Sequence, residues 1–185
     1  SDGDWVESKD QSSSGIRLIQ TGNIGEGVFK DRKDKARYIS DSTFSRLNCT
    51  EIFEGDCLIS RLPRPVGRAC LIPNTGEKMI TAVDCSILRF KQDIILPKFF
   101  VYYSQSAHYN SQIQPLCTGS TRKRISRKNL GKIEVPIPSI ERQKVIVEQL
   151  DYLYHRLIPN IVISPDLIFE KSQSDIKKII AYSTC

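Results

Sequence analysis

Apolar residues alternate with polar ones, or form short runs, in several stretches of the first half of the chain. A period of two is typical of a β-strand with one buried face, and a short apolar run between turn residues indicates a strand buried on both faces. A glycine-rich segment at 21–27 and the Pro-Asn-Thr-Gly sequence at 73–76 supply turns between such stretches. We therefore predict strands over residues 15–20, 57–60, 68–72 and 80–88.

The spacing of apolar residues changes toward the C-terminal end. Ser139 can cap a helix there, and Pro159 would end it because the proline ring removes a backbone donor. Between these two residues, four apolar side chains recur at i, i+4, i+7 and i+11, which places them on one face of a helix. This apolar stripe consists of Ile146, Leu150, Leu153 and Leu157.

Shorter elements complete the predicted layout. We expect helices over about residues 42–47, 98–106 and 174–182. A short strand over 133–138 should end at its prolines. A strand-rich part followed by a helical part is typical of the α+β class.

Positive charge is concentrated in one segment. The chain has 27 Lys and Arg against 21 Asp and Glu, which gives a formal net charge of +6. Residues 119–132 contain six basic residues and no acidic one, so this segment alone carries a surplus as large as that of the whole chain. Because a merely solvated surface usually mixes both signs, we interpret the segment as a binding site for a polyanion, with a bare surface loop as the alternative.

Two further basic clusters, at 30–37 and 61–68, lie in or beside loops. Arginine is suited to nucleic acid because its guanidinium pairs bidentately with guanine or phosphate, and hydroxyl and backbone N–H groups near a glycine can hold a phosphate. For Arg61 and Arg64, a proline-stiffened surface loop with ordinary salt bridges is a nearly equal alternative. The candidate DNA-binding residues are Lys30, Arg32, Lys33, Arg61, Arg64, Arg68, Ser120, Thr121, Arg122, Lys123, Arg124, Arg127 and Lys128.

The sequence shows no recognisable catalytic or metal-binding pattern. The glycines of 21–27 do not match a dinucleotide-binding or P-loop motif, and neither a Gly-x-Ser-x-Gly elbow nor a His-Glu-x-x-His motif occurs. The two histidines, His108 and His155, are far apart, and no Cys-x-x-Cys is present. We therefore predict no catalytic residue, no metal and no cofactor, and we expect the six cysteines to be reduced thiols.

The hydrophobic pattern also bears on location. No stretch approaches the roughly 20 apolar residues of a membrane span, and residues 1–20 contain no apolar signal core. We expect a cytoplasmic protein with no membrane partner.

A series of short segments resembles, in content and in order, the target recognition domain in specificity subunits of type I restriction–modification systems. The resemblance covers roughly residues 15–157, and no single segment is specific by itself. The matching segments are Ile19-Gln20-Thr21-Gly22-Asn23-Ile24-Gly25, Gly55-Asp56-Cys57-Leu58-Ile59-Ser60-Arg61 with Val66-Gly67-Arg68, Ala82-Val83-Asp84-Cys85, Gly119-Ser120-Thr121 with Ile125, and Val135-Pro136-Ile137-Pro138 leading into residues 141–147 and 150–151.

The resemblance implies a non-catalytic bacterial or archaeal subunit that reads one half of a bipartite sequence in double-stranded DNA. It implies a twisted, mixed or antiparallel β-sheet domain with short helices over 1–138, and a long helix over 139–158 that pairs with a second such helix; a helical tail over 159–185 would follow. The implied partners are methyltransferase (modification) subunits, and the restriction subunit as a further one. We expect the apolar stripe to form the interface with a second copy or a second recognition domain.

The chain also departs from the family pattern. A full specificity subunit carries two recognition domains and two long helices, whereas this chain shows one domain and a helix interrupted at Pro159. A half subunit that dimerises, a fragment and a degenerate copy are all compatible with this. Two other functions remain open: the detached recognition domain of a fused restriction–methylation enzyme, and an assembly protein that uses its helix without reading DNA.

Overall fold

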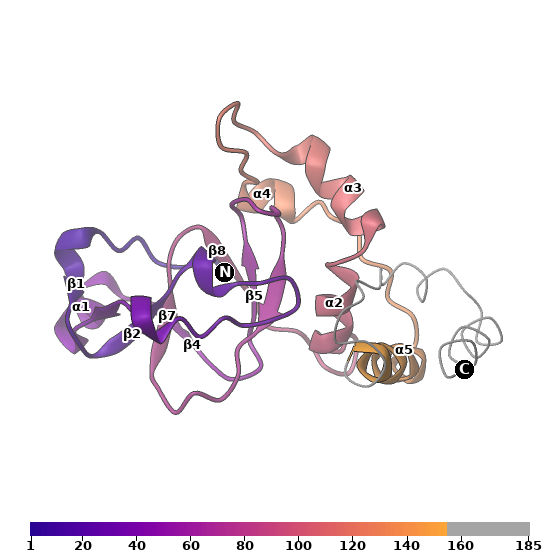
Figure 1. Cartoon of the computed structure of the whole chain (residues 1–185), viewed down its shortest axis with the longest axis horizontal. Coiled ribbons are helices and arrows are strands. Elements are labelled where there is room, and N and C mark those ends of the chain that lie inside the picture. The colour runs from indigo at the N-terminus through magenta and orange to yellow at the C-terminus, as the bar shows by residue number, and fades with distance from the viewer. Residues whose placement is uncertain (155–185) are drawn as a thin grey trace.

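The computed structural model describes residues 1–154 and has an α+β fold. The strands occupy the left and centre of Figure 1, and helices α2, α3 and α5 lie to the right. The described residues form eight strands: β1 (Gln11–Ser12), β2 (Ile16–Ile19), β3 (Tyr38–Ile39), β4 (Glu51–Ile52), β5 (Cys57–Ser60), β6 (Ala69–Leu71), β7 (Met79–Thr81) and β8 (Cys85–Leu88).

Serine side chains cap four of the five α-helices of the described part. Ser40, Ser106, Ser126 and Ser139 each accept a hydrogen bond from the backbone N–H three residues later, which satisfies a donor that the helix leaves unpaired. The fifth helix begins at a proline, whose fixed φ suits the first turn. The helices are α1 (Asp41–Leu47), α2 (Pro97–Tyr103), α3 (Ala107–Leu116), α4 (Arg127–Leu130) and α5 (Ile140–Tyr152); short 3-10 turns cover Ser8–Asp10, Thr21–Asn23 and Lys33–Lys35.

The strands form two sheets. The larger has five strands in the order β1-β3-β2-β7-β4, and β2 and β7 run parallel with Leu18 opposite Ile80. The smaller is antiparallel, in the order β6-β5-β8. Its central strand β5 is buried on both faces: Leu58 packs in a cluster shared with the larger sheet, whereas Ile59 packs against the helices. This double burial explains why Cys57, Leu58 and Ile59 of β5 are apolar in succession and do not alternate with polar residues.

Several predicted elements differ from the observed ones. The single strand expected over 80–88 is two strands, β7 and β8, which belong to different sheets and are separated by a turn at 82–84. The strand expected over 133–138 is absent, because that segment pairs with no strand among the described residues. Helix α3 was not predicted, and it contains Pro115 in its last turn. The helix expected over 174–182 lies outside the described residues.

Three of the four residues of the apolar stripe lie inside the molecule. Ile146, Leu150 and Leu153 are at most 4% exposed and belong to the same core cluster as Phe99 and Tyr102 of α2. The predicted role of these three residues as an intermolecular interface is therefore wrong: helical periodicity identifies a buried face, and here α2 of the same chain covers it. The fourth member of the stripe, Leu157, lies outside the described residues.

Five of the six cysteines fall within the described residues, and all five are free thiols. Burial raises the pKa of Cys85 to about 11 and that of Cys70 to about 12. These thiols are protonated at neutral pH and act as small apolar side chains of the core. Among the helices of residues 1–154, none combines the length and apolarity that crossing a bilayer requires.

Candidate nucleic-acid interface

Residues 118–128, which we call the basic loop, are closed at their base by backbone hydrogen bonds. Thr118 and Arg124 each donate an N–H to the other's carbonyl at 2.8 Å. The next residue, Ile125, is fully buried and donates its N–H to the carbonyl of Arg61 at 3.1 Å. The loop is thus fixed to the end of strand β5, while its tip remains outside the core.

The tip of the basic loop turns at Gly119, whose φ is +97°. A Cβ atom at this position would lie 2.6 Å from the Arg122 carbonyl oxygen, so the turn requires glycine. Its predicted DNA-binding residues are all exposed: Ser120, Thr121, Arg122, Lys123, Arg124, Arg127 and Lys128.

The basic loop and the proline loop, residues 61–67, enclose a surface hollow of about 570 Å³. Arg64 lines the hollow from the proline loop, and Arg122 and Lys123 line it from the basic loop. Two of the three predicted basic clusters therefore meet in space, although about 55 residues separate them in sequence. Three cations around one hollow, with the hydroxyl groups of Ser120 and Thr121, suit phosphate oxygens and base edges.

Arg68 is buried, and its guanidinium binds backbone carbonyls. Its Nε donates to Ile24 at 2.6 Å, and its two terminal nitrogens donate to Thr21 and Leu62 at 2.7 Å and to Pro65 at 2.9 Å. Burial lowers the pKa of Arg68 from its ordinary value. The sequence placed Arg68 among the DNA contacts; in the structure it joins the proline loop to the glycine-rich segment and is only 9% exposed.

Arg61 is also buried, with its side chain only 5% exposed. Its guanidinium donates to the Val83 carbonyl and lies 3.6 Å from a carboxylate oxygen of Asp2. Its backbone N–H donates to the Asp84 carbonyl at 2.8 Å. Like Arg68, Arg61 is held by contacts inside the fold. Of the three arginines predicted in this cluster, only Arg64 is exposed.

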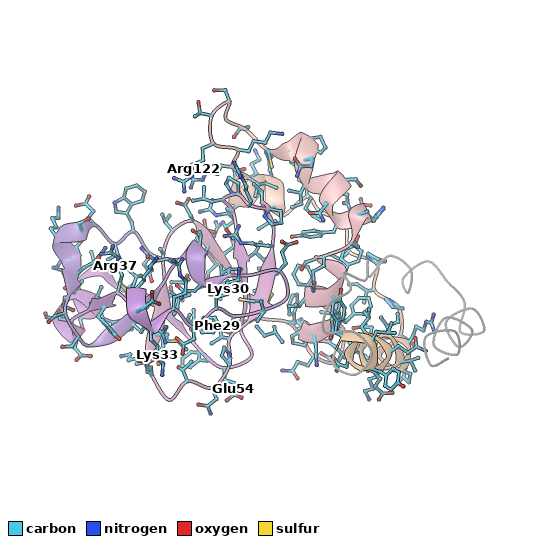
Figure 2. The ribbon with its side chains drawn as sticks, in the orientation of Figure 1. Phe29, Lys30, Lys33, Arg37, Glu54 and Arg122 are labelled. Carbon is cyan, nitrogen blue, oxygen red and sulfur yellow. The ribbon has the colours of Figure 1, made fainter. Side chains whose placement is uncertain are left out.

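The first predicted cluster stands apart from the other two. Lys30, Arg32 and Lys33 are exposed, and Figure 2 shows Lys30 and Lys33 well below Arg122 in the view. Arg32 lines a separate polar hollow of about 530 Å³ together with Arg37. The structure therefore presents two basic regions and does not merge all three clusters into one.

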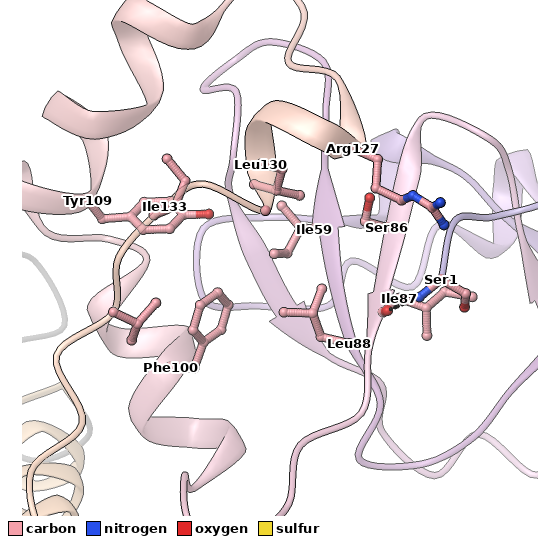
Figure 3. Close-up of a pocket in the computed structure, with 12 residues that line it drawn as sticks. Ser1, Ile59, Ser86, Ile87, Leu88, Phe100, Tyr109, Arg127, Leu130 and Ile133 are labelled. Atoms are coloured by element: carbon pink, nitrogen blue, oxygen red, sulfur yellow. Dashed lines mark hydrogen bonds between the residues drawn. The ribbon is translucent and has the colours of Figure 1, made fainter.

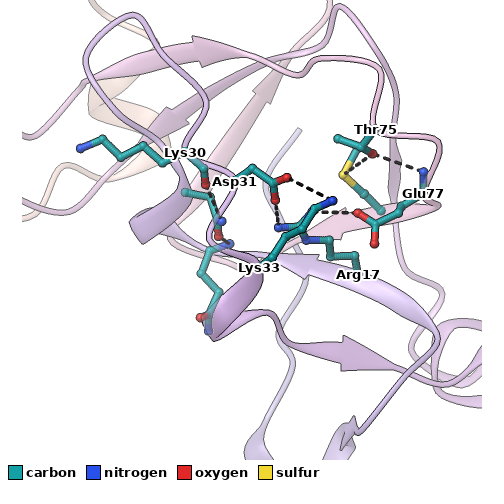
Figure 4. A network of polar contacts seen from close by, with 9 residues as sticks. Arg17, Lys30, Asp31, Lys33, Thr75 and Glu77 are labelled. Carbon is teal, nitrogen blue, oxygen red and sulfur yellow. Dashed lines mark hydrogen bonds and ion pairs between the residues drawn. The ribbon is translucent and has the colours of Figure 1, made fainter.

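An ion-pair network that the sequence did not reveal anchors this first cluster (Figure 4). Arg17 on β2 is 1% exposed; it pairs with Asp31 and, at 2.7 Å, with Glu77. Burial alone would lower the pKa of Arg17, but its hydrogen bonds to the two carboxylates outweigh burial and raise it. Asp31 also lies 3.8 Å from Lys33, so the network connects the cluster to the core of the larger sheet.

An apolar pocket of about 300 Å³ lies between the smaller sheet and the helices (Figure 3). Ile59, Phe100 and Leu130 line it, and Arg127 lies at its rim next to Ser86. None of its lining residues carries a carboxylate, thiol or imidazole group. Within residues 1–154, no cluster of three or more His, Cys, Asp or Glu side chains is placed to hold a metal ion.

Comparison with known protein families identifies the family of this chain. The family model described as the type I restriction modification DNA specificity domain matches residues 5–162, which is most of the chain. The chain belongs to this family. The resemblance found in the sequence is thereby confirmed.

Relatives of this specificity domain include the specificity subunits of two type I restriction enzymes. The chain is 33% identical to that of StySPI from Salmonella potsdam and 32% identical to that of EcoKI from Escherichia coli K12, in each case over 69 residues that cover 37% of this chain and 15% of the relative. The chain thus matches only a small part of each of these proteins.

Solved structures show the same fold. The HsdS subunit from Thermoanaerobacter tengcongensis superposes with a TM-score of 0.58 at 16% identity, over 76% of this chain and 36% of that one. A chain from a study of complex assembly and conformational transition of the type I R-M system superposes with a TM-score of 0.62 at 12% identity, over 99% of this chain and 42% of that one.

In this specificity domain, several segments that carried the sequence resemblance meet around Arg61. The segment 55–61 forms β5, and 66–68 leads into β6 beside it. The segment 82–85 supplies the Asp84 carbonyl that accepts the Arg61 N–H, and the basic loop is tied to the Arg61 carbonyl. These segments are therefore joined through the backbone of Arg61, the first residue of the proline loop.

Proposed function

We propose that this specificity domain reads one half of a bipartite sequence in double-stranded DNA. The observation that carries the proposal is the hollow between the proline loop and the basic loop, where Arg64, Arg122 and Lys123 converge from distant parts of the sequence. Convergent exposed cations on loops fixed to a rigid sheet match what DNA requires, since phosphate contacts position a protein and base contacts specify the sequence.

The proposal also includes the partners of the domain, and it assigns catalysis to those partners. The domain would act in the cytoplasm of a bacterium or archaeon with methyltransferase (modification) subunits and the restriction subunit, and these would supply catalysis. A second recognition domain would read the other half-site. Ile146, Leu150 and Leu153 are not part of this proposal, because they lie in the core of residues 1–154.

Salt dependence tests the proposal directly. The binding constant of the full chain for a short DNA duplex would be measured by fluorescence anisotropy over a range of salt concentrations. Six exposed cations, Arg64, Arg122, Lys123, Arg124, Arg127 and Lys128, lie on or next to the two loops, and Arg124 is paired with Asp84. If the other five contact phosphates, log K should fall with log salt at a slope near −4.5, from roughly −0.9 per contact. A slope near zero, or no binding, would contradict the proposal.

A further inference from the structure

Two carboxylates from distant parts of the chain lie against arginines of the basic loop. Asp84 Oδ1 is 3.1 Å from Arg124 Nη2, and Asp2 Oδ2 is 3.8 Å from Arg127 Nε. Residues 119–132 contain no acidic residue, so the fold supplies the negative charge that the local sequence lacks.

Both carboxylates are fixed in place by the backbone around them. Asp84 lies in the turn between β7 and β8, where its carbonyl accepts the Arg61 N–H. Asp2 accepts a hydrogen bond from Ser86 Oγ at 2.8 Å. The next residue, Gly3, lies so close to the Ala82 carbonyl that a Cβ atom would be 2.2 Å from its oxygen. The backbone of each acid is therefore fixed beside its arginine, and only the side chain can move.

The ion pair of Asp84 is accessible to a competing anion. The Arg124 side chain is 46% exposed and that of Asp84 is 31% exposed. Exposed pairs are weak and screened by salt, so a DNA phosphate can replace the carboxylate. Asp84 Oδ1, the oxygen that faces Arg124, is itself buried, so the exposed part of the Asp84 side chain lies on its other atoms.

We propose that Asp84 is a specificity-determining residue, and this inference rests on the proposed function. On non-cognate DNA, a phosphate that pairs with Arg124 must displace Asp84 and lie near its negative charge, which reduces affinity. On cognate DNA, the Asp84 carboxylate accepts a hydrogen bond from a base amino group, as carboxylates do from cytosine N4. A repulsive and an attractive contribution from one side chain together increase discrimination. Asp2 forms a similar ion pair with Arg127, at the longer distance of 3.8 Å.

The variant Asp84→Asn tests this inference in the full chain, with a duplex of random sequence as the probe. We expect its affinity to rise about fivefold, the upper range for an exposed ion pair, and its salt slope to steepen by about 0.9. In an Arg124→Gln background the same substitution should change little, because the two residues act as a pair.

A matched control separates this effect from net charge. Glu54→Gln removes the same charge from an exposed side chain, and Figure 2 shows Glu54 at the opposite end of the view from Arg122. We expect no change in affinity for Glu54→Gln. An equal rise in both variants, or no rise in Asp84→Asn, would overturn the inference while leaving DNA binding intact. If the wild-type chain binds no duplex, the proposed function itself fails.

If circular dichroism shows that Asp84→Asn does not fold, two other variants, Arg124→Gln and Arg122→Gln, test the same inference. Arg124 is held by Asp84, whereas Arg122 forms no ion pair within residues 1–154. On random duplex, Arg124→Gln should therefore change affinity less than twofold, and Arg122→Gln should weaken it about threefold or more. Equal losses in the two variants would overturn the role assigned to Asp84.

Discussion

Removing two cations from the tip of the basic loop should change the salt dependence of DNA binding by a defined amount. Arg122 and Lys123 are exposed and line the hollow with Arg64. At roughly 0.9 per phosphate contact, the double variant Arg122→Ala/Lys123→Ala should flatten the slope by about 1.8. Over a fourfold rise in salt, from about 50 to 200 mM, two contacts correspond to a factor of about 12 in the binding constant. The variant should lose about 12-fold less affinity than the wild type over that range.

The matched control is Lys91→Ala/Lys144→Ala, which removes the same net charge from exposed positions on other parts of the fold. Both double variants should remain as stable as the wild type to within about 0.5 kcal/mol, since the changed side chains are on the surface. Binding would be followed by anisotropy with the same duplex at each salt concentration. If the two double variants flatten the slope equally, the basic loop has no special role and only net charge matters.

Three further results follow from buried groups. Arg68→Met removes four hydrogen bonds to backbone carbonyls, and those of Ile24 and Pro65 lose their donor; it should lower the free energy of unfolding by about 3 kcal/mol in urea, whereas Arg64→Met should change it by less than about 0.5 kcal/mol. Equal effects would contradict the roles given to these arginines. Leu150→Asp places a charge in the core and should destabilise the fold by about 4 kcal/mol or more, and a variant that melts like the wild type would contradict the packing of α5 on α2. Burial raises the pKa of Cys70 to about 12 and that of Cys85 to about 11, and burial together with nearby Asp4 raises the pKa of Cys49 to about 11. These thiols should therefore resist alkylation at about pH 8 until the chain is unfolded. Rapid labelling of these cysteines in the native protein, located by mass spectrometry, would refute this.

The sequence predicted correctly those secondary-structure elements that neighbouring residues alone determine. The apolar run of β5 predicted a strand at its observed bounds, and Ser139 predicted the start of α5 at the observed residue. Both signals depend only on neighbours in the sequence, namely a buried run between turn residues and a side chain that caps a backbone N–H. The break between β7 and β8 has no such signal, because residues 82–84 contain neither glycine nor proline and only the separate pairing of the two strands reveals it.

The candidate site was predicted in part, for a similar reason. The exposed cations of the basic loop follow from an acid-free run in the sequence. Burial of Arg61 and Arg68 does not, because their acceptors are carbonyls and a carboxylate brought in by the tertiary fold. The counterions Asp2 and Asp84 are likewise remote in sequence from the arginines they hold. Periodicity correctly gave α5 a buried face, but it contains no information on whether the covering helix belongs to the same chain.

The most direct test of the central claim is selection of bound sequences from a random duplex pool at about 150 mM salt, with and without a modification subunit. If the domain reads a half-site, a short motif of a few base pairs should be enriched from the pool, and the enrichment should be lost with Arg122→Ala/Lys123→Ala and kept with Lys91→Ala/Lys144→Ala. A folded chain that enriches no motif in either condition would contradict sequence reading by this domain.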